Sequence, residues 1–341
     1  MRKTFPLPPR WERLGEGTWR AAAAVLALLL TACGTAAPAP AGAASKPAQV
    51  RASGLTHVKV ALTSKATGGL YLYVGRNLGI FQKHGLDAEI VIGQSAALVT
   101  GLNQGDLDFM GTIPSAIQGA EQGLPIRGVF VAKDHPEYVL VGDTGITQIS
   151  QLKGKELSGS VPTQLPTQML QQLLRLNGLQ PSDYTVIPVA DDNARTALVQ
   201  QHRVAAGILG LSQAMPLLDA GHPLLDTTLE KVYNPSNGLA TTMSTIQNRR
   251  ELVQRAVDAA LEATHVAATD KARTTDVLMK EFGHTEANAS RVFDLLKPSY
   301  TQNGRASSEG IKFQLETDAK AMELPKPKTE ADVYDWSFLP R

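Results

Sequence analysis

Short apolar segments typical of strands alternate along the chain with segments of helical periodicity. The segment 57–62 (HVKVAL) alternates apolar and polar residues, which predicts a strand, whereas 70–84 has helical spacing and ends at Gly85, a typical helix C-cap. Further strands are predicted at 88–92, 107–110, 126–131, 156–160, 184–189, 204–209 and 239–243, and further helices at 95–104, 116–122, 167–177, 194–201, 214–220, 249–269, 271–282, 285–297 and 307–322. This alternation predicts an α/β fold with mostly parallel sheets.

A weak internal repeat divides this pattern into two halves. Residues 104–109 (QGDLDF) align with 201–206 (QHRVAA) at an offset of 97, and 123–126 (GLPI) align with 221–224 (GHPL) at an offset of 98. We interpret this as two similar α/β lobes of about 90 residues each, the size of a small domain. The alternative is coincidence in a chain rich in Ala, Gly and Leu.

The composition excludes several classes of protein. Lys and Arg total 33 against 32 for Asp and Glu, so the chain lacks the clustered basic excess expected of a nucleic-acid-binding protein. Apolar residues make up 43% of the chain, which suits an α/β core rather than a disordered or multi-pass membrane protein. A single cysteine and seven scattered histidines indicate no disulfide framework and no metal site, and we expect no cofactor.

The N-terminal region has the features of a bacterial lipoprotein signal. Residues 21–30 (AAAAVLALLL) are apolar but too short to span a bilayer, and Arg10, Arg13 and Arg20 supply positive charge before them. The following Leu30-Thr-Ala-Cys33 matches a lipobox, whose cysteine carries the lipid, and Cys33 is the only cysteine of the chain. We therefore expect a signal peptide at 1–32, lipidation of Cys33 and a flexible Ala/Pro/Gly-rich tether at 33–55. The alternative is a buried free cysteine after an apolar helix.

Polar residues concentrate in the loops that follow the predicted strands. Ligands of open α/β sheets bind beyond the carboxyl ends of strands, so two facing lobes predict a polar cleft. The candidate ligand-binding residues are Ser64, Lys65, Thr67, Gln94, Ser95, Thr112, Ser115, Lys133, Thr163, Thr167, Arg195, Gln213 and Asn237. Lys65, Lys133 and Arg195 are the cations that would serve an anionic ligand, whereas a flat aromatic ligand would use Tyr71, Tyr73 or Phe130. The alternative roles are helix capping, solvated loop charges and core packing.

Four segments resemble one bacterial family. They are 70–90 (LYLYVGRNLGIFQKHGLDAEI), 105–109 (GDLDF), 149–156 (ISQLKGKE) and 250–263 (RELVQRAVDAALEA). They are similar to motifs of the ABC-transporter solute-binding proteins for aliphatic sulfonates, nitrate and thiamine-pyrimidine precursors. The resemblance covers about residues 57–300. Residues 201–206 depart from the family pattern, because the usual glycine and aspartate are missing there.

The resemblance implies a two-lobed periplasmic-binding-protein-like fold of type II, with a ligand cleft between two parallel-sheet lobes. Hinge crossings are expected near 133–139 and 233–239. Lobe 1 would comprise 56–135 and 237–325, lobe 2 would comprise 136–236, and 326–341 would form a surface tail. The implied function is that of an exported, lipid-anchored component of an ABC importer. It would be monomeric, capture a small polar organic solute and deliver it to permease and ATPase subunits.

Two other classes of function remain as alternatives. A sensory or scaffold lipoprotein would bind a solute without transporting it. The second alternative is an enzyme with the same fold, since thiamine-pyrimidine synthases have this fold. The sequence lacks the cysteine-rich motif of those enzymes, and it also lacks a nucleophile elbow, a P-loop and a dinucleotide-binding fingerprint. Asp106 and Asp108 could form a carboxylate pair or simply a turn at a strand edge. We expect no catalytic residues.

Cys33→Ser tests the lipid anchor. The thiol is the atom that would carry the lipid, so the substitution should move the protein from the membrane fraction to the soluble fraction. Fractionation followed by immunoblotting measures this. Unchanged membrane association of the variant would contradict the lipobox interpretation.

Overall fold

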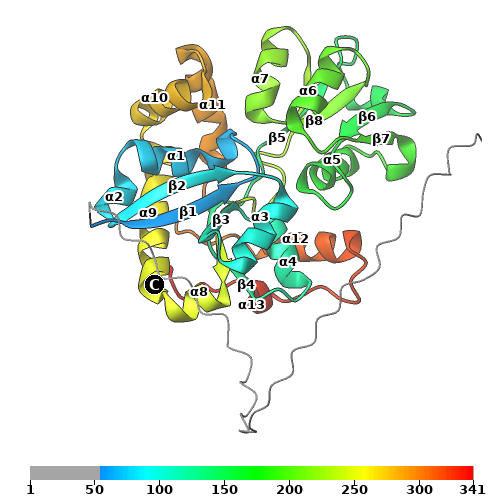
Figure 1. Cartoon of the computed structure of the whole chain (residues 1–341). Helices are drawn as coiled ribbons and strands as arrows, with labels where there is room; N and C mark the ends of the chain where they lie inside the picture. Colours follow the sequence, from blue (N-terminus) through cyan, green and yellow to red (C-terminus); the bar gives the residue numbers. More distant parts are fainter. Residues whose placement is uncertain (1–53, 341) are drawn as a thin grey trace, which may run out of the picture. The chain divides into compact units, whose positions relative to one another are not determined.

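The computed structural model describes residues 54–340, which contain two five-stranded sheets flanked by helices (Figure 1). The first sheet, in the order β2-β1-β3-β10-β4, is formed by β1 (Thr56–Leu62), β2 (Leu86–Ile92), β3 (Phe109–Thr112), β4 (Ile126–Lys133) and β10 (Asn237–Thr242). The second, in the order β7-β6-β8-β5-β9, is formed by β5 (Tyr138–Gly142), β6 (Glu156–Gly159), β7 (Thr185–Pro188), β8 (Ala206–Gly210) and β9 (Leu224–Thr227). The predicted α/β fold class is confirmed.

The helices of residues 54–340 follow most of the predicted segments, two of them with the predicted bounds. They are α1 (Leu70–Asn77), α2 (Ile80–Lys83), α3 (Ser95–Gln104), α4 (Pro114–Glu121), α5 (Leu165–Leu176), α6 (Asp192–Gln200), α7 (Leu211–Asp219), α8 (Met243–Asn248), α9 (Arg250–Thr269), α10 (Lys271–Phe282), α11 (Glu286–Leu296), α12 (Ser308–Ala321) and α13 (Glu330–Val333). Short 3₁₀ turns lie at Thr67–Gly69, Ile149–Leu152, Pro181–Asp183 and Lys297–Ser299. Where one helix was predicted at 70–84, the left-handed Gly79 (φ 70°) separates α1 from α2.

Each sheet has a parallel core completed by antiparallel strands. β1 pairs in parallel with β2 and β3, and β6 pairs in parallel with β7 and β8. β10 is antiparallel to β3 and β4, and β5 is antiparallel to β8 and β9. The sequence prediction missed β5 and β9, because β5 follows β4 after only residues 134–137, with no intervening helix to mark a new strand.

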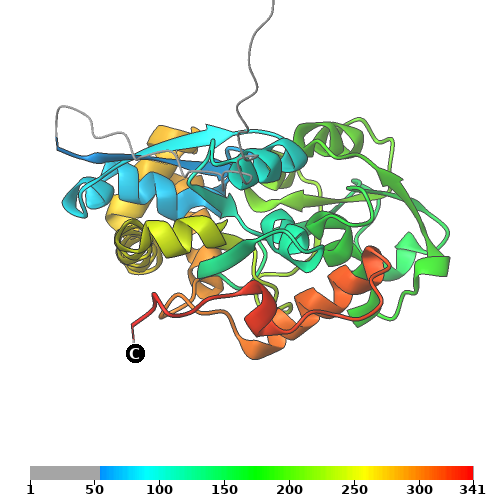
Figure 2. The ribbon, with the colours of Figure 1, turned by 60° about the horizontal axis from the view of Figure 1, so that its bottom comes forward.

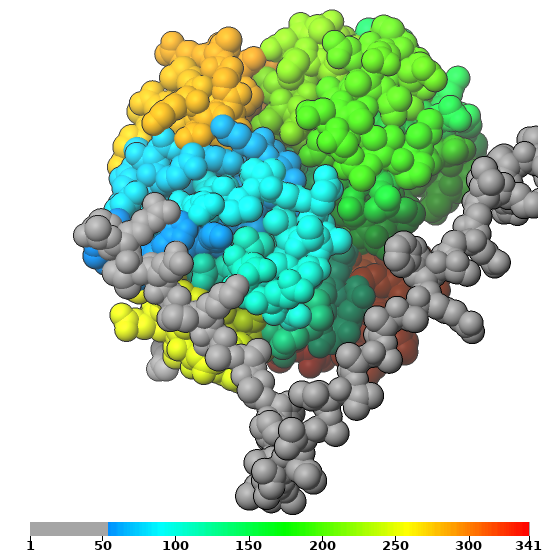
Figure 3. All heavy atoms as spheres, viewed as in Figure 1, coloured from blue at the N-terminus to red at the C-terminus, as the bar shows by residue number. Residues whose placement is uncertain are grey.

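The chain passes between the sheets twice. Residues 134–137 lead from β4 to β5, and residues 228–236 return from β9 to β10. On the face shown in Figure 3, the green segment that carries the second sheet forms a mass distinct from the blue and cyan first sheet and its helices. Strands that precede and follow the second sheet in the sequence therefore form the first sheet, whereas the second is built from one continuous segment.

The internal sequence repeat corresponds to a repeated helix–turn–strand unit. Gly105 ends α3 with φ 79°, and His202 follows the end of α6 with φ 56°, so both turns use the left-handed region. Asp108 in the first unit accepts hydrogen bonds from the backbone N–H of Lys59 (2.9 Å) and from Arg249 (2.6 Å). The aspartate of this motif therefore fixes a strand edge, and Ala205 at the equivalent position of the second unit cannot do so.

The C-terminal segment is not the surface tail that the sequence suggested. α13 and the residues after it pack against the first sheet, where Tyr334 forms a parallel bridge with Gly128 and Asp335 N–H donates to the Gly128 carbonyl. Val333 and Phe338 are almost completely buried. The apolar and aromatic residues beyond the Pro-Lys-rich 325–328 explain this packing.

The predicted signal peptide, Cys33 and all but the last two residues of the predicted tether lie outside the described residues. Within 54–340, none of the helices combines the length and the apolar character needed to cross a bilayer.

α12 connects the helices of both sheets through one buried carboxylate. Oδ1 of Asp318 accepts a hydrogen bond from Nε2 of Gln118 on α4 (2.8 Å) and another from Nε2 of Gln168 on α5 (2.7 Å). Gln118 also donates to the Thr163 carbonyl (2.8 Å). α12 (orange-red) runs along the lower edge of the molecule in Figure 2. This cluster, Gln118–Gln168–Asp318, ties the two sheets together away from the connecting segments.

Burial shifts two carboxyl groups of this region toward their protonated forms. Burial raises the pKa of Asp318 to about 6, against the opposing effect of its two glutamine donors. Burial and the nearby Asp318 charge raise the pKa of Glu121 to about 8, and both Glu121 carboxyl oxygens are buried without a hydrogen-bond partner among the described residues. Both groups bind protons more tightly in the folded than in the unfolded chain, so the free energy of unfolding should fall as pH rises from about 4 to about 8.

Glu121→Gln tests this pH dependence. The amide has no ionised form, so the variant should melt a few degrees above the wild type at pH 8, and the difference should shrink toward pH 5. Thermal unfolding across this pH range measures the effect, with Glu156→Gln at the exposed start of β6 as the control. A difference between Glu121→Gln and wild type that does not vary with pH would contradict the prediction.

Candidate functional site

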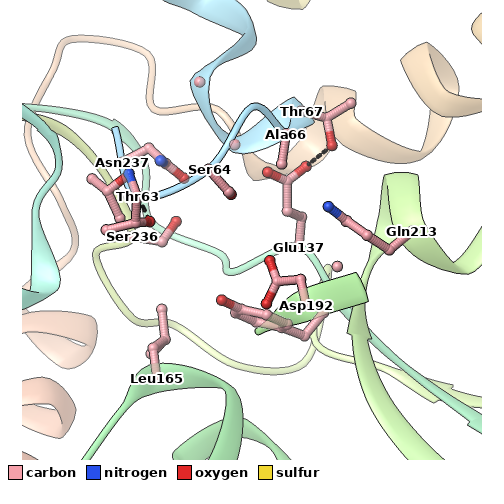
Figure 4. A pocket seen from close by; sticks show the side chains of 15 residues that line it. Thr63, Ser64, Ala66, Thr67, Glu137, Leu165, Asp192, Gln213, Ser236 and Asn237 are labelled. Carbon is pink, nitrogen blue, oxygen red and sulfur yellow. Dashed lines mark hydrogen bonds between the residues drawn. The ribbon is translucent and has the colours of Figure 1, made fainter. Parts of the chain in front are cut away.

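Two adjoining cavities lie between the sheets and form one cleft that is open to solvent. The inner cavity, drawn in Figure 4, has a volume of about 530 Å³ and the outer one a volume of about 1190 Å³, and both volumes include open solvent. Both are lined by Thr63, Ser64, Thr112, Tyr138, Leu165, Asp192 and Gln213. The inner cavity adds Ala66, Thr67, Gly68, Gly69, Glu137, Gly210, Ser236 and Asn237, and the outer one adds Lys65, Gln94, Ser95, Pro114, Ser115, Gln118, Gln164, Pro166, Ala190, Asp191 and Asn193. Both sheets and the connecting segments contribute to these walls.

A buried ion pair lies behind the wall of the inner cavity, and of its two members only Glu137 lines the cavity. Nζ of Lys133 lies 3.4 Å from Oε2 of Glu137 and donates to the Thr67 carbonyl at 2.8 Å. The same Oε2 accepts a hydrogen bond from Oγ1 of Thr67 (2.7 Å; Figure 4), which in turn accepts one from Ser212 (3.0 Å). Lys133 also lies 4.8 Å from the ring centroid of Tyr300. This network joins the end of β4, the first connecting segment, the start of α7 and the turn before α1.

Burial lowers the pKa of Lys133, and the neighbouring Glu137 charge and hydrogen bond oppose that shift. The ammonium group is held in place by three partners: the Thr67 carbonyl, the Glu137 carboxylate and the face of Tyr300. None of its surface is exposed to the cavity. Its positive charge therefore acts on Glu137 and not directly on a ligand.

A second pair of charges stands at the start of α6. Arg195 is completely buried, and its guanidinium donates to the carbonyls of Val189 (2.8 Å), Ala190 (3.1 Å) and Ile208 (3.3 Å) and to the carboxylate of Asp192. Asp192 lines both cavities. Here too, the carboxylate faces the cleft and the cation lies behind it.

Several helices begin at the cleft with first turns that no side chain caps. α3, α4, α5 and α7 begin there without a side-chain cap, whereas α8, α10, α11 and α12 are capped by Thr242, Asp270, Thr285 and Ser307. Uncapped first turns leave backbone N–H groups free to donate to water or to a ligand. α6 is the exception, since Asp191 accepts from Ala194 N–H (2.8 Å).

Most of the predicted binding residues line the cleft. These are Ser64, Lys65, Thr67, Gln94, Ser95, Thr112, Ser115, Gln213 and Asn237. Lys65 stands at the outer cavity with its ammonium 3.3 Å from Glu281. These residues belong to the loops after the strands and to the starts of the following helices, which converge at the cleft.

Four predicted residues do not line the cleft. Lys133 and Arg195 are held by the buried networks described above. Thr167 is buried and donates to the Ser160 carbonyl (2.6 Å), so it braces the turn into α5. Thr163 offers its carbonyl to Gln118 (2.8 Å), and its side chain is not part of the cavity walls. The expectation that these side chains face a ligand is therefore wrong in the geometry described here.

The sequence did not predict the acidic residues and the tyrosine that line the cleft. Glu137 and Tyr138 lie at the unrecognised entry to β5, and Asp191 and Asp192 lie just before the predicted helix 194–201. The Asp191-Asp192 doublet at a helix start was the one available signal. Tyr71 and Phe130, considered as possible aromatic walls, pack against each other in the core, with the Tyr71 hydroxyl bonded to the Gly238 carbonyl.

The cleft has the composition of a binding site. Its walls supply hydroxyl, amide and carboxylate groups, and residues 54–340 contain no group of three or more His, Cys, Asp or Glu side chains arranged to hold a metal ion. In the Asp106/Asp108 pair, the carboxylate of Asp108 accepts hydrogen bonds from Lys59 N–H and from Arg249 at the edge of the first sheet.

Solved structures share this fold at low sequence identity. The aliphatic sulphonate-binding protein SsuA of Escherichia coli superimposes with a TM-score of 0.68 at 16% identity, covering 82% of this chain and 97% of that one. A zinc-bound ligand-binding component of an ABC-type import system from Staphylococcus aureus gives 0.66 at 15%, covering 83% and 97%. The nitrate-binding protein NrtA of Synechocystis gives 0.56 at 14%, covering 69% of each chain. The two-lobed periplasmic-binding-protein-like fold expected from the sequence is thus confirmed.

A comparison with curated proteins gave no match. A family model described as NMT1/THI5 like matches residues 67–273, from the first cleft turn to α10. Since this match spans more than half of the chain and agrees with the resemblance seen in the sequence motifs, the protein belongs to the NMT1/THI5-like family.

Proposed function

We propose that this protein is the solute-binding component of an ABC importer, exported and lipid-anchored at the outer face of the cytoplasmic membrane. It captures a small polar organic solute in the cleft between its sheets and delivers it to a permease and its ATPase. The protein works as a monomer, without a cofactor and without catalysing a reaction. The observation that carries this proposal is the cleft itself, which both sheets line with hydrogen-bonding groups.

The connecting segments supply a means of coupling binding to a change of shape. We place lobe 1 at 56–135 and 237–325 and lobe 2 at 136–236, so that residues 134–137 and 228–236 act as hinges between them. A solute that contacts both lobes binds the closed form better than the open form and shifts the population toward closure. The closed surface is then what the permease recognises.

Further support comes from the family and from the N-terminal sequence. Structures with this fold include a ligand-binding component of an ABC-type import system. The lipobox at Leu30–Cys33 would hold such a component at the membrane where the permease lies.

Thermal unfolding of the purified protein against a panel of amino acids, amines, sulfonates, nitrate, pyrimidines and flavins tests the proposal. A solute present at about 100 times its Kd should add about 2.7 kcal/mol to the unfolding free energy and raise the Tm by a few degrees. Thr112→Trp should abolish this shift, because Thr112 lines both cavities at the end of β3 and the indole would fill them.

Thr144→Trp, at an exposed turn of the second sheet, is the matched control and should keep the shift. Equal shifts in the wild type and both variants would mean that the solute binds elsewhere. The absence of a shift with every member of the panel would contradict a role in capturing solutes of these classes.

A further inference from the structure

The two walls of the inner cavity differ in charge. Lobe 1 contributes neutral hydroxyl and amide groups, among them Ser64, Thr112 and Asn237, whereas lobe 2 contributes the carboxylates of Glu137 and Asp192. Figure 4 shows both carboxylates on the same side of the cavity, next to Gln213. Within residues 54–340, Lys65 is the only lysine or arginine that lines either cavity, and it stands at the outer one, paired with Glu281.

Glu137 keeps one carboxylate oxygen available at the cavity. Its Oε2 is engaged by Thr67 and Lys133, whereas no hydrogen bond to Oε1 is found within residues 54–340. A Cβ atom on Gly68 would lie 2.8 Å from Oε1, so glycine at this position leaves the oxygen uncovered. Glu137 is only 8% exposed, and that exposure is to the cavity it lines.

The cations that neutralise these carboxylates lie behind them. Lys133 and Arg195 have no exposed surface, so a ligand in the cavity meets the oxygen atoms of Glu137 and Asp192 first. Because electrostatic interactions weaken with distance, the nearer negative charge outweighs the farther positive one for any group that touches the wall. An anion placed there would also lose its water without gaining a cationic partner.

An aromatic ring completes the same wall. Tyr138 lines both cavities, and burial together with the Asp192 charge raises its pKa, so its hydroxyl stays neutral close to that carboxylate. The faces of aromatic rings attract cations, and the attraction grows when water is excluded. Tyr138 and the carboxylates therefore favour the same kind of ligand group.

We infer that the solute recognised by this cleft carries a protonated amine or another small organic cation, which binds between Glu137 and Asp192. The inference rests on the proposed solute-binding function and names its ligand class. The uncapped starts of α4, α5 and α7 and the hydroxyls of lobe 1 bind hydrogen-bond-accepting groups on the rest of the solute. The cleft thus differs in charge preference from those of relatives that bind sulphonate or nitrate.

The test is isothermal titration of the purified protein with small solutes of three kinds: primary and quaternary amines, uncharged polyols and amides, and sulfonates and nitrate. The solute bound most tightly should carry a cationic nitrogen. Glu137→Gln and Asp192→Asn keep the shape of each side chain and remove its charge, so each should weaken binding of that solute by roughly tenfold to a hundredfold, the effect of losing one charge-assisted hydrogen bond.

Two further variants separate binding from folding. Glu137→Gln leaves Lys133 buried without a carboxylate, which lowers stability, so the double variant Glu137→Gln/Lys133→Met removes the pair together and should show the same loss of affinity. Glu156→Gln removes one exposed carboxylate of the same lobe and should bind the solute as the wild type does.

Tight binding of a sulfonate, nitrate or uncharged solute in preference to every amine would overturn the inference and leave the solute-binding function standing. An amine that binds both Glu137→Gln and Asp192→Asn with the same affinity as the wild type would also overturn the inference and leave the solute-binding function standing. Failure of all three kinds to bind would contradict the proposed function and this inference with it.

Discussion

The buried Lys133–Glu137 pair is the interaction on which the arrangement of this molecule most depends. Lys133 is the last residue of the first sheet before the chain crosses, and Glu137 is the last residue before the second sheet begins. Through Thr67 and Ser212 the same network reaches the turn before α1 and the start of α7. A buried charge without its partner is strongly destabilising, so the crossing is tied to both sheets at the bottom of the cleft.

The same pair gives the cleft its polarity. Lys133 pairs with the carboxylate of Glu137, and Arg195 pairs with that of Asp192, each from the side that faces the protein interior. This pairing lowers the free-energy cost of placing two carboxylates at a partly buried cavity. Sequence reasoning treated these cations as ligand contacts because long basic side chains near predicted loops are common anion receptors. Because both cations are completely buried, they hold the carboxylates in place, and the carboxylates face the ligand.

The sequence predicted local structure better than long-range placement. The β1 and α10 segments and the turn at Gly85 were evident from alternation, helical spacing and glycine. The strands β5 and β9 were missed, because their positions depend on pairing with strands far away in the sequence. For the site, the loops carrying Ser64, Thr112 and Gln213 could be identified from strand ends, whereas the burial of Arg195 depends on three carbonyl groups that no local pattern reveals.

The position of β10 constrains the order in which the chain can fold. β10 lies between β3 and β4, so the first sheet lacks an interior strand until residues 237–242 have been synthesised, whereas the second sheet is complete once β9 has formed. During synthesis from the N-terminus, β3 and β4 keep unpaired edges while the more than one hundred residues between β4 and β10 are synthesised. The second sheet therefore completes its fold before the first, although most strands of the first sheet are synthesised earlier. The first sheet remains incomplete for longer, and during that time it is a possible target for aggregation or for chaperones.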